Sequence, residues 1–145
     1  MDRFVGRYEH SLDTKGRLVL PTRLRPGFEG PLGGYLAKGQ EGCLALWPHE
    51  RYEERLARLE AQAEATEDVK DRARVRLFAS AEHVVPDAQG RIVVAPYLQE
   101  WAGLDPARVL VYGANKIVEL WNAARWEELE SMAEQDLLGT TAGAS

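Results

Sequence analysis

An internal repeat constrains the fold of this chain more than any other feature. The residues from Asp13 to Leu20, Asp-Thr-Lys-Gly-Arg-Leu-Val-Leu, recur 74 positions later as Asp-Ala-Gln-Gly-Arg-Ile-Val-Val. The same offset holds, without a gap, for further pairs along the chain: Phe4 and Phe78, Leu24 and Leu98, Gly39 and Gly113, Trp47 and Trp121, and Arg51 and Arg125. Because a chance match would not keep this register across loops, the chain contains two copies of one small unit.

The repeat also predicts the organisation of the chain. We expect a first unit at residues 4–64, a connecting helix at 65–77, a second unit at 78–136 and a flexible tail at 137–145. In the first unit we expect a hairpin over 4–20, a helical turn after Pro21, a hairpin over 35–47 and a helix after Pro48. A unit this short would expose its sheet face, so the two copies should close around a pseudo-two-fold axis. The expected fold class is α+β, mostly β.

Composition limits the location and the partners of the protein. The net charge of -5 and the isoelectric point near 5.3 argue against a uniformly basic nucleic-acid binder. The single cysteine, Cys43, cannot form an intrachain disulfide, which favours a cytoplasmic protein, and its apolar strand predicts a buried side chain. No stretch approaches the roughly 18 apolar residues of a membrane span, so we expect no membrane partner.

The charge is distributed unevenly along the chain. Residues 1–25 carry six basic and three acidic side chains, and residues 71–77 carry three basic and one acidic. The segments 26–70 and 78–145 have net charges of -4 and -6. The first hairpin and the linker are therefore basic. Charge runs on helices are usually solvated faces, and this is the reading favoured for the linker arginines, Arg72, Arg74 and Arg76.

The strongest chemical signal is a duplicated Asp-x-x-Gly-Arg turn. Its residues are Asp13, Gly16 and Arg17 in the first copy and Asp87, Gly90 and Arg91 in the second. The carboxylate can accept backbone N–H bonds, and the glycine permits positive φ, so turn chemistry alone would explain a single copy. Two copies related by a pseudo-two-fold axis would present two arginines on one side of the molecule. The planar guanidinium suits phosphate and the O6/N7 edge of guanine.

No other motif predicts catalysis or a metal site. His10, His49 and His83 have neither ligand spacing nor cysteine partners, and the sequence has no phosphate-binding glycine loop or nucleophile elbow. We therefore expect no enzymatic activity, no cofactor, no metal and no small-molecule substrate. Four tryptophans could stack on single-stranded bases, namely Trp47, Trp101, Trp121 and Trp126. The equivalent positions of Trp47 and Trp121 at strand ends favour core packing instead.

Taken together, these segments resemble the MraZ family. The resemblance rests on Asp13–Leu18 with Pro21 and Arg25, on Asp87–Ile92, on Leu98 with Ala102–Leu104, and on Glu119–Trp121 with Trp126. It covers nearly the whole chain, from Phe4 to about Trp126. It implies two SpoVT-AbrB-like units that form an intrachain swapped-hairpin AbrB-like barrel with peripheral helices.

The resemblance also implies a function. Members of this family are expected to be sequence-specific, double-stranded DNA-binding transcriptional regulators that assemble as homo-oligomeric rings and associate with the nucleoid. Their sites would be short direct repeats upstream of the bacterial division and cell-wall gene cluster, including the regulator's own promoter. The expected DNA-binding residues are Lys15, Arg17, Arg23, Arg25, Gln89 and Arg91, and the turn-organising residues are Asp13, Gly16, Asp87 and Gly90. Arg17 would read a base edge, and Lys15, Arg23 and Arg25 would contact phosphate.

The second copy departs from the family pattern. Ala95 stands where the first unit has Pro21, and Ala88 occupies a position that is often basic. The second turn therefore offers a single cation, Arg91, so the first turn is expected to be the main contact. An alternative from another class is an oligomeric protein-interaction scaffold or antitoxin-like module, and the sequence leaves it open.

Overall fold

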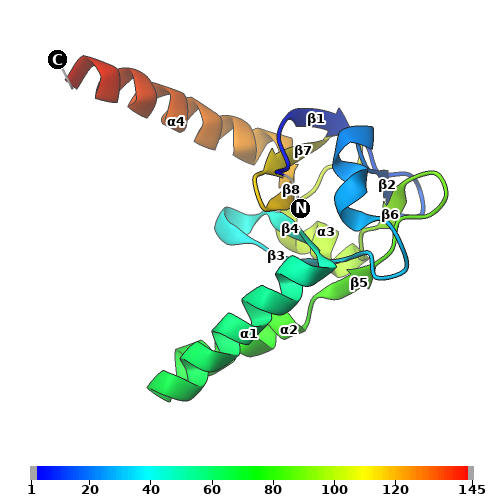
Figure 1. Cartoon of the computed structure of the whole chain (residues 1–145). Coiled ribbons are helices and arrows are strands. Elements are labelled where there is room, and N and C mark those ends of the chain that lie inside the picture. The colour runs from blue at the N-terminus through cyan, green and yellow to red at the C-terminus, as the bar shows by residue number, and fades with distance from the viewer. Residues whose placement is uncertain (1–2, 144–145) are drawn as a thin grey trace.

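The computed structural model describes residues 3–143 as an α+β fold (Figure 1). Its strands are β1 Arg7–His10, β2 Arg17–Val19, β3 Gly34–Lys38, β4 Leu44–Pro48, β5 Glu82–Val84, β6 Arg91–Val93, β7 Val109–Ala114 and β8 Ile117–Asn122. Its helices are α1 His49–Thr66, α2 Val69–Ala79, α3 Pro96–Ala102 and α4 Ala123–Gly143, with 3-10 segments η1 Thr22–Phe28 and η2 Gln40–Gly42. The prediction of a mostly β chain is wrong, because α1 and α4 reach 18 and 21 residues while several strands have only three.

The strands form two antiparallel groups. One is a six-stranded sheet in the order β1-β7-β8-β4-β3-β5, and the other is the two-stranded ribbon β2-β6. The hairpin expected over residues 4–20 does not form, because β1 pairs with β7 and β2 pairs with β6. The two segments are linked next to the turn, by the Leu12–Leu18 bridge and by the hydrogen bond from the N–H of Asp13 to the carbonyl of Arg17. The first strand of each unit instead lies beside the second hairpin of the other unit. In the first unit this strand is β1, which pairs with β7, and in the second unit it is β5, which pairs with β3. This exchange covers hairpin edges that an isolated unit would expose.

The barrel implied by the resemblance is not confirmed. The strands are exchanged between the units, but β1 and β5 stand at the two edges of the six-stranded sheet, and the β2-β6 ribbon is separate from it. The structure is therefore an open sheet with an accompanying ribbon.

A pseudo-two-fold axis relates the two units. It passes through the Ala45–Glu119 pair of β4 and β8 and through the Leu18–Ile92 pair of the ribbon. The two members of each pair are 74 positions apart in the sequence, so each pair is mapped onto itself. The repeat in the sequence therefore corresponds to a symmetry of the strand pairing.

The offset changes to 75 at one place. The pair Leu36–Leu46 in the first hairpin corresponds to Val111–Leu120 in the second, so β3 and β7 are related by 75 positions and β4 and β8 by 74. The connection within the second hairpin is one residue shorter, and the segment before it is one residue longer. Gly113 is thus the counterpart of Lys38, and the expected match of Gly39 with Gly113 is wrong.

Apolar residues of both units share one core. Leu18, Leu20, Ile92 and Val94 of the ribbon region are almost fully buried together with leucines of β3, β4 and β8. As expected, Trp121 is buried, with 1% of its surface exposed, and Cys43 is fully buried. Trp47 is half-buried and packs edge-on against Phe78, with ring centroids 5.2 Å apart. The two units therefore depend on each other for burial.

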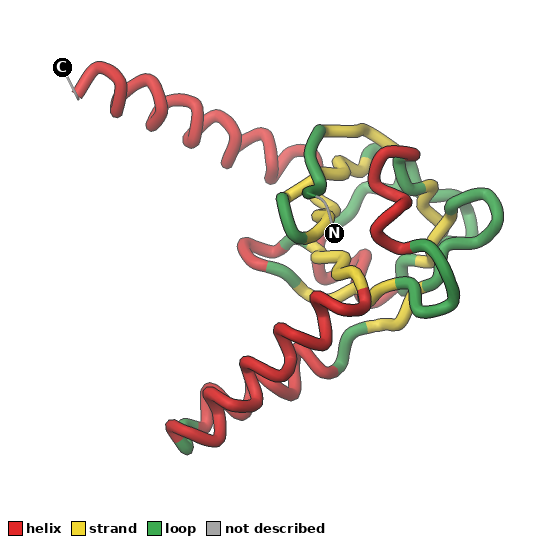
Figure 2. The backbone as a smooth tube through the Cα atoms, in the orientation of Figure 1, coloured by secondary structure: helices red, strands yellow, loops and turns green. Residues whose placement is uncertain are grey.

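The long helices α1, α2 and α4 lie on one side of the molecule, and the ribbon lies on the other (Figure 1). In Figures 1 and 2, α4 and the α1-α2 pair extend to the left, while β2 and β6 with their turns lie at the right. The predicted flexible tail is helical as far as Gly143, and its last residues, 144–145, lie outside the described residues. No helix between residues 3 and 143 is long and apolar enough to cross a membrane.

Candidate nucleic-acid interface

A single carboxylate organises the first Asp-x-x-Gly-Arg turn. Oδ1 of Asp13 accepts hydrogen bonds from the backbone N–H groups of Lys15 and Arg17, each at 2.9 Å. Oδ2 accepts a hydrogen bond from Nε of Arg17 at 2.7 Å. Gly16, which has a φ of +74°, donates its N–H to the carbonyl of Asp13. The turn therefore fixes the backbone and the arginine side chain together.

The second turn repeats this geometry. Oδ1 of Asp87 accepts from the backbone N–H groups of Gln89 and Arg91 at 2.9 Å, and Oδ2 accepts from Nε of Arg91 at 2.7 Å. Gly90 has a φ of +77°. In both turns the hydrogen bond from the arginine backbone N–H is the main cause that lowers the pKa of the aspartate. Both carboxylates are therefore charged at neutral pH and hold their arginines by charge-assisted bonds.

Each turn is attached to the strand of the other unit. The N–H of Leu20 donates to the carbonyl of Gly90, and the N–H of Val94 donates to the carbonyl of Gly16, both at 2.8 Å. These bonds lie at opposite ends of the antiparallel ribbon. The ribbon and its two turns are consequently one rigid, pseudo-symmetric element.

The outer face of the ribbon combines charge with apolar surface. Arg17 lies opposite Val93, and Arg91 lies opposite Val19, while the central pair of the ribbon is buried. The arginine side chains are 29% and 28% exposed, and 37% of Val19 and 55% of Val93 are exposed. Both arginines also line a hollow of about 300 Å³ beside β5. This face therefore offers two fixed guanidinium groups and two methyl-bearing side chains around one axis.

The structure assigns Arg25 a place that the sequence did not predict. Its Nε donates to the carbonyl of Leu20 at 2.8 Å, and its guanidinium lies over Gly90, where a Cβ atom would be 2.4 Å away. The equivalent residue, Gln99 of α3, donates from Nε2 to the carbonyl of Val94 at 2.8 Å and lies over Gly16. Each side chain supports the turn of the other unit. Gln99 was not singled out in the sequence, although its offset of 74 from Arg25 is a signal.

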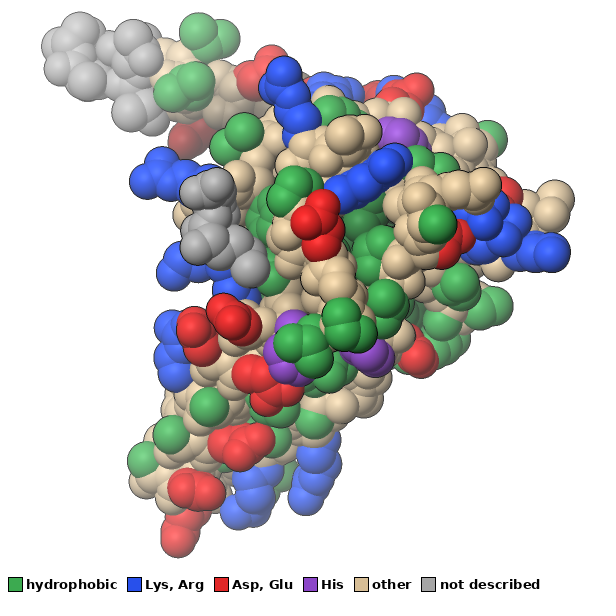
Figure 3. Space-filling model, turned by 45° about the vertical axis from the view of Figure 1, so that its right-hand side comes forward, with side chains coloured by type: hydrophobic (Ala, Val, Ile, Leu, Met, Phe, Trp, Pro, Cys, Tyr) green, Lys and Arg blue, Asp and Glu red, His purple; other side chains and the backbone are tan. Residues whose placement is uncertain are grey.

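The remaining predicted DNA-binding residues are exposed around the two turns. Lys15 and Gln89 occupy equivalent exposed positions in the two turns, and Arg23 is exposed on η1. Because η1 contacts the second turn through Arg25, the cations of the first unit are shared between both turns. Figure 3, in which this side of the molecule comes forward, shows basic side chains at its edge beside hydrophobic ones.

The basic linker lies away from the β2-β6 ribbon. Its residues belong to α2, which extends away from the ribbon in Figure 1, and Arg74 forms an ion pair with the buried Asp71 at 2.8 Å. The linker arginines are thus separate from the turns. Among residues 3–143, the histidine, cysteine and acidic side chains form no group of three that could hold a metal ion.

Comparison with known proteins identifies the family. A family model described as "MraZ protein, putative antitoxin-like" matches residues 3–75 and 77–142, one segment for each unit. Three proteins named transcriptional regulator MraZ are similar over most of their length. The protein of Nocardioides sp. is 39% identical over 90% of this chain and 88% of its own length, that of Thermobifida fusca 38% over 91% and 90%, and that of Frankia casuarinae 40% over 90% and 90%. The relatives are named as regulators, in agreement with the expectation of a protein that is not an enzyme, and the chain belongs to the MraZ family of transcriptional regulators.

Proposed function

We propose that this transcriptional regulator binds double-stranded DNA sequence-specifically through the outer face of the β2-β6 ribbon and its two turns. The duplicated turn carries the proposal, since in both copies the aspartate side chain accepts the same three hydrogen bonds, two of them from the arginine, around one pseudo-two-fold axis. The sites would be short direct repeats upstream of the division and cell-wall gene cluster, including the protein's own promoter. Binding would place the cytoplasmic protein on the nucleoid.

The fixed arginines favour base reading. Nε of Arg17 and of Arg91 is bound by the turn aspartate, which sets the plane of the guanidinium and leaves its two terminal amino groups as donors. A guanine presents O6 and N7 to such a pair of donors, and Val19 and Val93 can contact thymine methyl groups. Because the side chains are held before binding, little conformational entropy is lost on contact.

The exposed cations would supply phosphate contacts. Lys15 stands at the first turn and Arg23 on η1, which contacts the second turn. Phosphate contacts orient a protein on the duplex and carry no sequence information directly. So few cations per chain give weak binding, and a ring of chains on successive repeats would raise the affinity through effective concentration.

The main test replaces the arginines. Arg17→Ala and Arg91→Ala should each weaken binding to the upstream fragment by roughly 5- to 150-fold, the equivalent of about 1–3 kcal/mol for a bidentate base contact. Arg72→Ala is the matched control, since Arg72 is an exposed arginine on α2, and should bind as the wild type does. Fluorescence anisotropy with a labelled duplex measures the affinities. Wild-type binding by the Arg17→Ala, Arg91→Ala double variant would refute the proposal.

Salt dependence separates this function from a protein-interaction scaffold or antitoxin-like module. The affinity of a DNA complex should fall steeply with salt through counterion release, and Lys15→Ala should lower the slope of log K against log salt by about one. An apolar protein interface would be far less sensitive. Footprinting upstream of the protein's own gene then tests the sites, where protection at regularly spaced boxes is expected.

A further inference from the structure

A glutamine on α3 reaches across to the first turn of the ribbon. Gln99 donates from Nε2 to the carbonyl of Val94 at 2.8 Å, and the N–H of Val94 donates to the carbonyl of Gly16. Gln99 also covers Gly16, where a Cβ atom would lie 2.8 Å from Nε2. Because Gly16 directly precedes Arg17, these contacts are made next to the arginine of the first turn.

Arg25 of η1 makes the equivalent contacts at the other end of the ribbon. Its Nε donates to the carbonyl of Leu20 at 2.8 Å, and the N–H of Leu20 donates to the carbonyl of Gly90. The guanidinium lies over Gly90, which is buried and directly precedes Arg91. Both copies therefore use the same series of contacts, with an amide in one and a guanidinium in the other.

These contacts hold the peptide group from which each turn arginine departs. In the first turn, this peptide group consists of the carbonyl of Gly16 and the N–H of Arg17. The carbonyl accepts from Val94, and the N–H donates to Oδ1 of Asp13. Since a peptide group is planar, bonds at both ends fix its orientation. Loss of the Gln99 side chain would free the carbonyl of Val94 and uncover a glycine, the residue with the widest conformational freedom.

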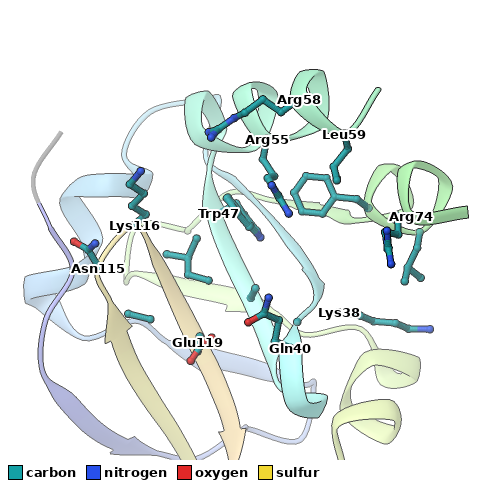
Figure 4. A pocket seen from close by; sticks show the side chains of 16 residues that line it. Lys38, Gln40, Trp47, Arg55, Arg58, Leu59, Arg74, Asn115, Lys116 and Glu119 are labelled. Atoms are coloured by element: carbon teal, nitrogen blue, oxygen red, sulfur yellow. The ribbon is translucent and has the colours of Figure 1, made fainter. Parts of the chain in front are cut away.

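Arg25 is held differently from arginines that line an open groove. Arg55 and Arg58 line a groove of about 600 Å³ between α1, α2 and the sheet (Figure 4), and within residues 3–143 neither side chain has a hydrogen bond or an ion pair. The Nε of Arg25, in contrast, is bound to Leu20, and a Cβ atom on Gly90 would lie 2.4 Å from its Cζ. This packing favours an internal role for Arg25 over a phosphate contact.

We infer that Gln99 and Arg25 are positioning residues of the DNA interface, and that each acts on the turn of the other unit. Gln99 orients Arg17, and Arg25 orients Arg91. The effect of both residues on DNA binding rests on the proposed function. The inference gives α3, which carries none of the predicted DNA-binding residues, a part in base reading without contact to DNA.

Double-mutant cycles test which arginine each residue acts through. Gln99→Ala should weaken binding to a labelled duplex from the upstream fragment by roughly 3- to 10-fold, because Arg17 must then be ordered on binding. This loss should vanish in an Arg17→Ala background and persist in an Arg91→Ala background. Arg25→Ala should show the reverse pattern. Fluorescence anisotropy measures the affinities, and circular dichroism checks folding.

The repeat itself supplies conservative replacements. Gln99→Arg and Arg25→Gln each install the side chain of the equivalent position, so each keeps a donor and should bind within about twofold of wild type. Gln62→Ala on α1 and Arg72→Ala on α2 are the matched controls, since both residues are exposed away from the ribbon, and should bind as the wild type does. Arg25→Gln should also leave the slope of log K against log salt unchanged. A slope lowered by about one would mean a phosphate contact and would overturn the role of Arg25.

The pKa of Asp13 provides a readout that needs no DNA. The backbone N–H of Arg17 is the main cause that lowers this pKa, and the amide of Gln99 carries no charge. Gln99→Ala should therefore raise the pKa of Asp13 toward its ordinary value by loosening the turn, and leave the pKa of Asp87 unchanged. NMR titration of the carboxyl groups measures both values. An unchanged pKa of Asp13 overturns the positioning role of Gln99.

The two proposals fail in different ways. Wild-type binding by the Arg17→Ala, Arg91→Ala double variant would refute the DNA interface, while a raised pKa of Asp13 in Gln99→Ala would still show that α3 holds the first turn. If the double variant loses binding but Gln99→Ala binds as the wild type does, the DNA interface stands and the positioning inference is overturned. A loss that persists undiminished in the Arg17→Ala background overturns it as well.

Discussion

The packing of Arg25 over Gly90 allows a quantitative test of how the two units support each other. Gly90→Ala adds a Cβ atom at a φ of +77°, which costs about 1–2 kcal/mol for an L-residue in the left-handed region. The new atom would lie 2.4 Å from the guanidinium of Arg25. Because the guanidinium is the end of a flexible side chain, it can turn aside, but it then loses its hydrogen bond to Leu20. A hydrogen bond from a charged group contributes about 1.5–3 kcal/mol.

The expected destabilisation is therefore about 2.5–5 kcal/mol, measured as the free energy of unfolding in urea at pH 7. Gly30→Ala provides the matched control, since Gly30 has a φ of +86° and a Cβ atom there would meet nothing within 4 Å. Its cost should be the backbone strain alone, about 1–2 kcal/mol. The difference between the two variants isolates the Arg25 contact.

A double-mutant cycle sharpens this prediction. In an Arg25→Ala background, Gly90→Ala should cost only the backbone strain, so the coupling energy between the two positions should be about 1.5–3 kcal/mol. Equal costs for Gly90→Ala and Gly30→Ala, together with a coupling energy below about 0.5 kcal/mol, would refute the reasoning. Arg25 would then not support the second turn.

Three further predictions concern single groups. The hydrogen bonds that lower the pKa of Asp13 and Asp87 stabilise the fold while both carboxylates are charged. The free energy of unfolding should therefore fall as the pH decreases below about 4. In urea titrations, the variant with Asn at both positions should show a smaller fall. Asp71→Ala should destabilise the protein by about 1–3 kcal/mol in thermal or urea unfolding, because it removes the buried acceptor for Thr66 and Arg74. Burial raises the pKa of the Cys43 thiol, so native protein at pH 8 should react with a thiol reagent only as fast as it unfolds.

Local chemistry made the turns predictable from the sequence. Asp13 and Gly16 interact within five consecutive residues, and an aspartate that accepts backbone N–H bonds beside a glycine with positive φ is determined by those residues. The duplication then predicted the second turn without further information. Burial of Trp121 in β8 and of Cys43 directly before β4 followed from the apolar composition of these segments.

Strand partners were not predictable in the same way. The segment at residues 7–10 has the composition of a strand whichever strand it joins, and its pairing with β7 is decided by which edge remains open after the units meet. A hairpin between neighbouring segments is the simplest expectation, and here the pairing across units replaces it. The direction of Arg25 depends on this exchange too, since Gly90 comes near only because β2 pairs with β6.

The exchange of strands changes how many cations lie near each of the two turns. In the sequence, the second turn has fewer cations than the first, because Gln89 stands in place of Lys15 and Arg91 is the one basic residue of the turn. In the structure, η1 of the first unit contacts that second turn, and the guanidinium of Arg25 lies over Gly90. Positive charge from the first unit is thereby placed at both ends of the ribbon. Divergence of the second turn removes less charge from the candidate interface than its own sequence indicates, because the fold supplies a cation from the other unit.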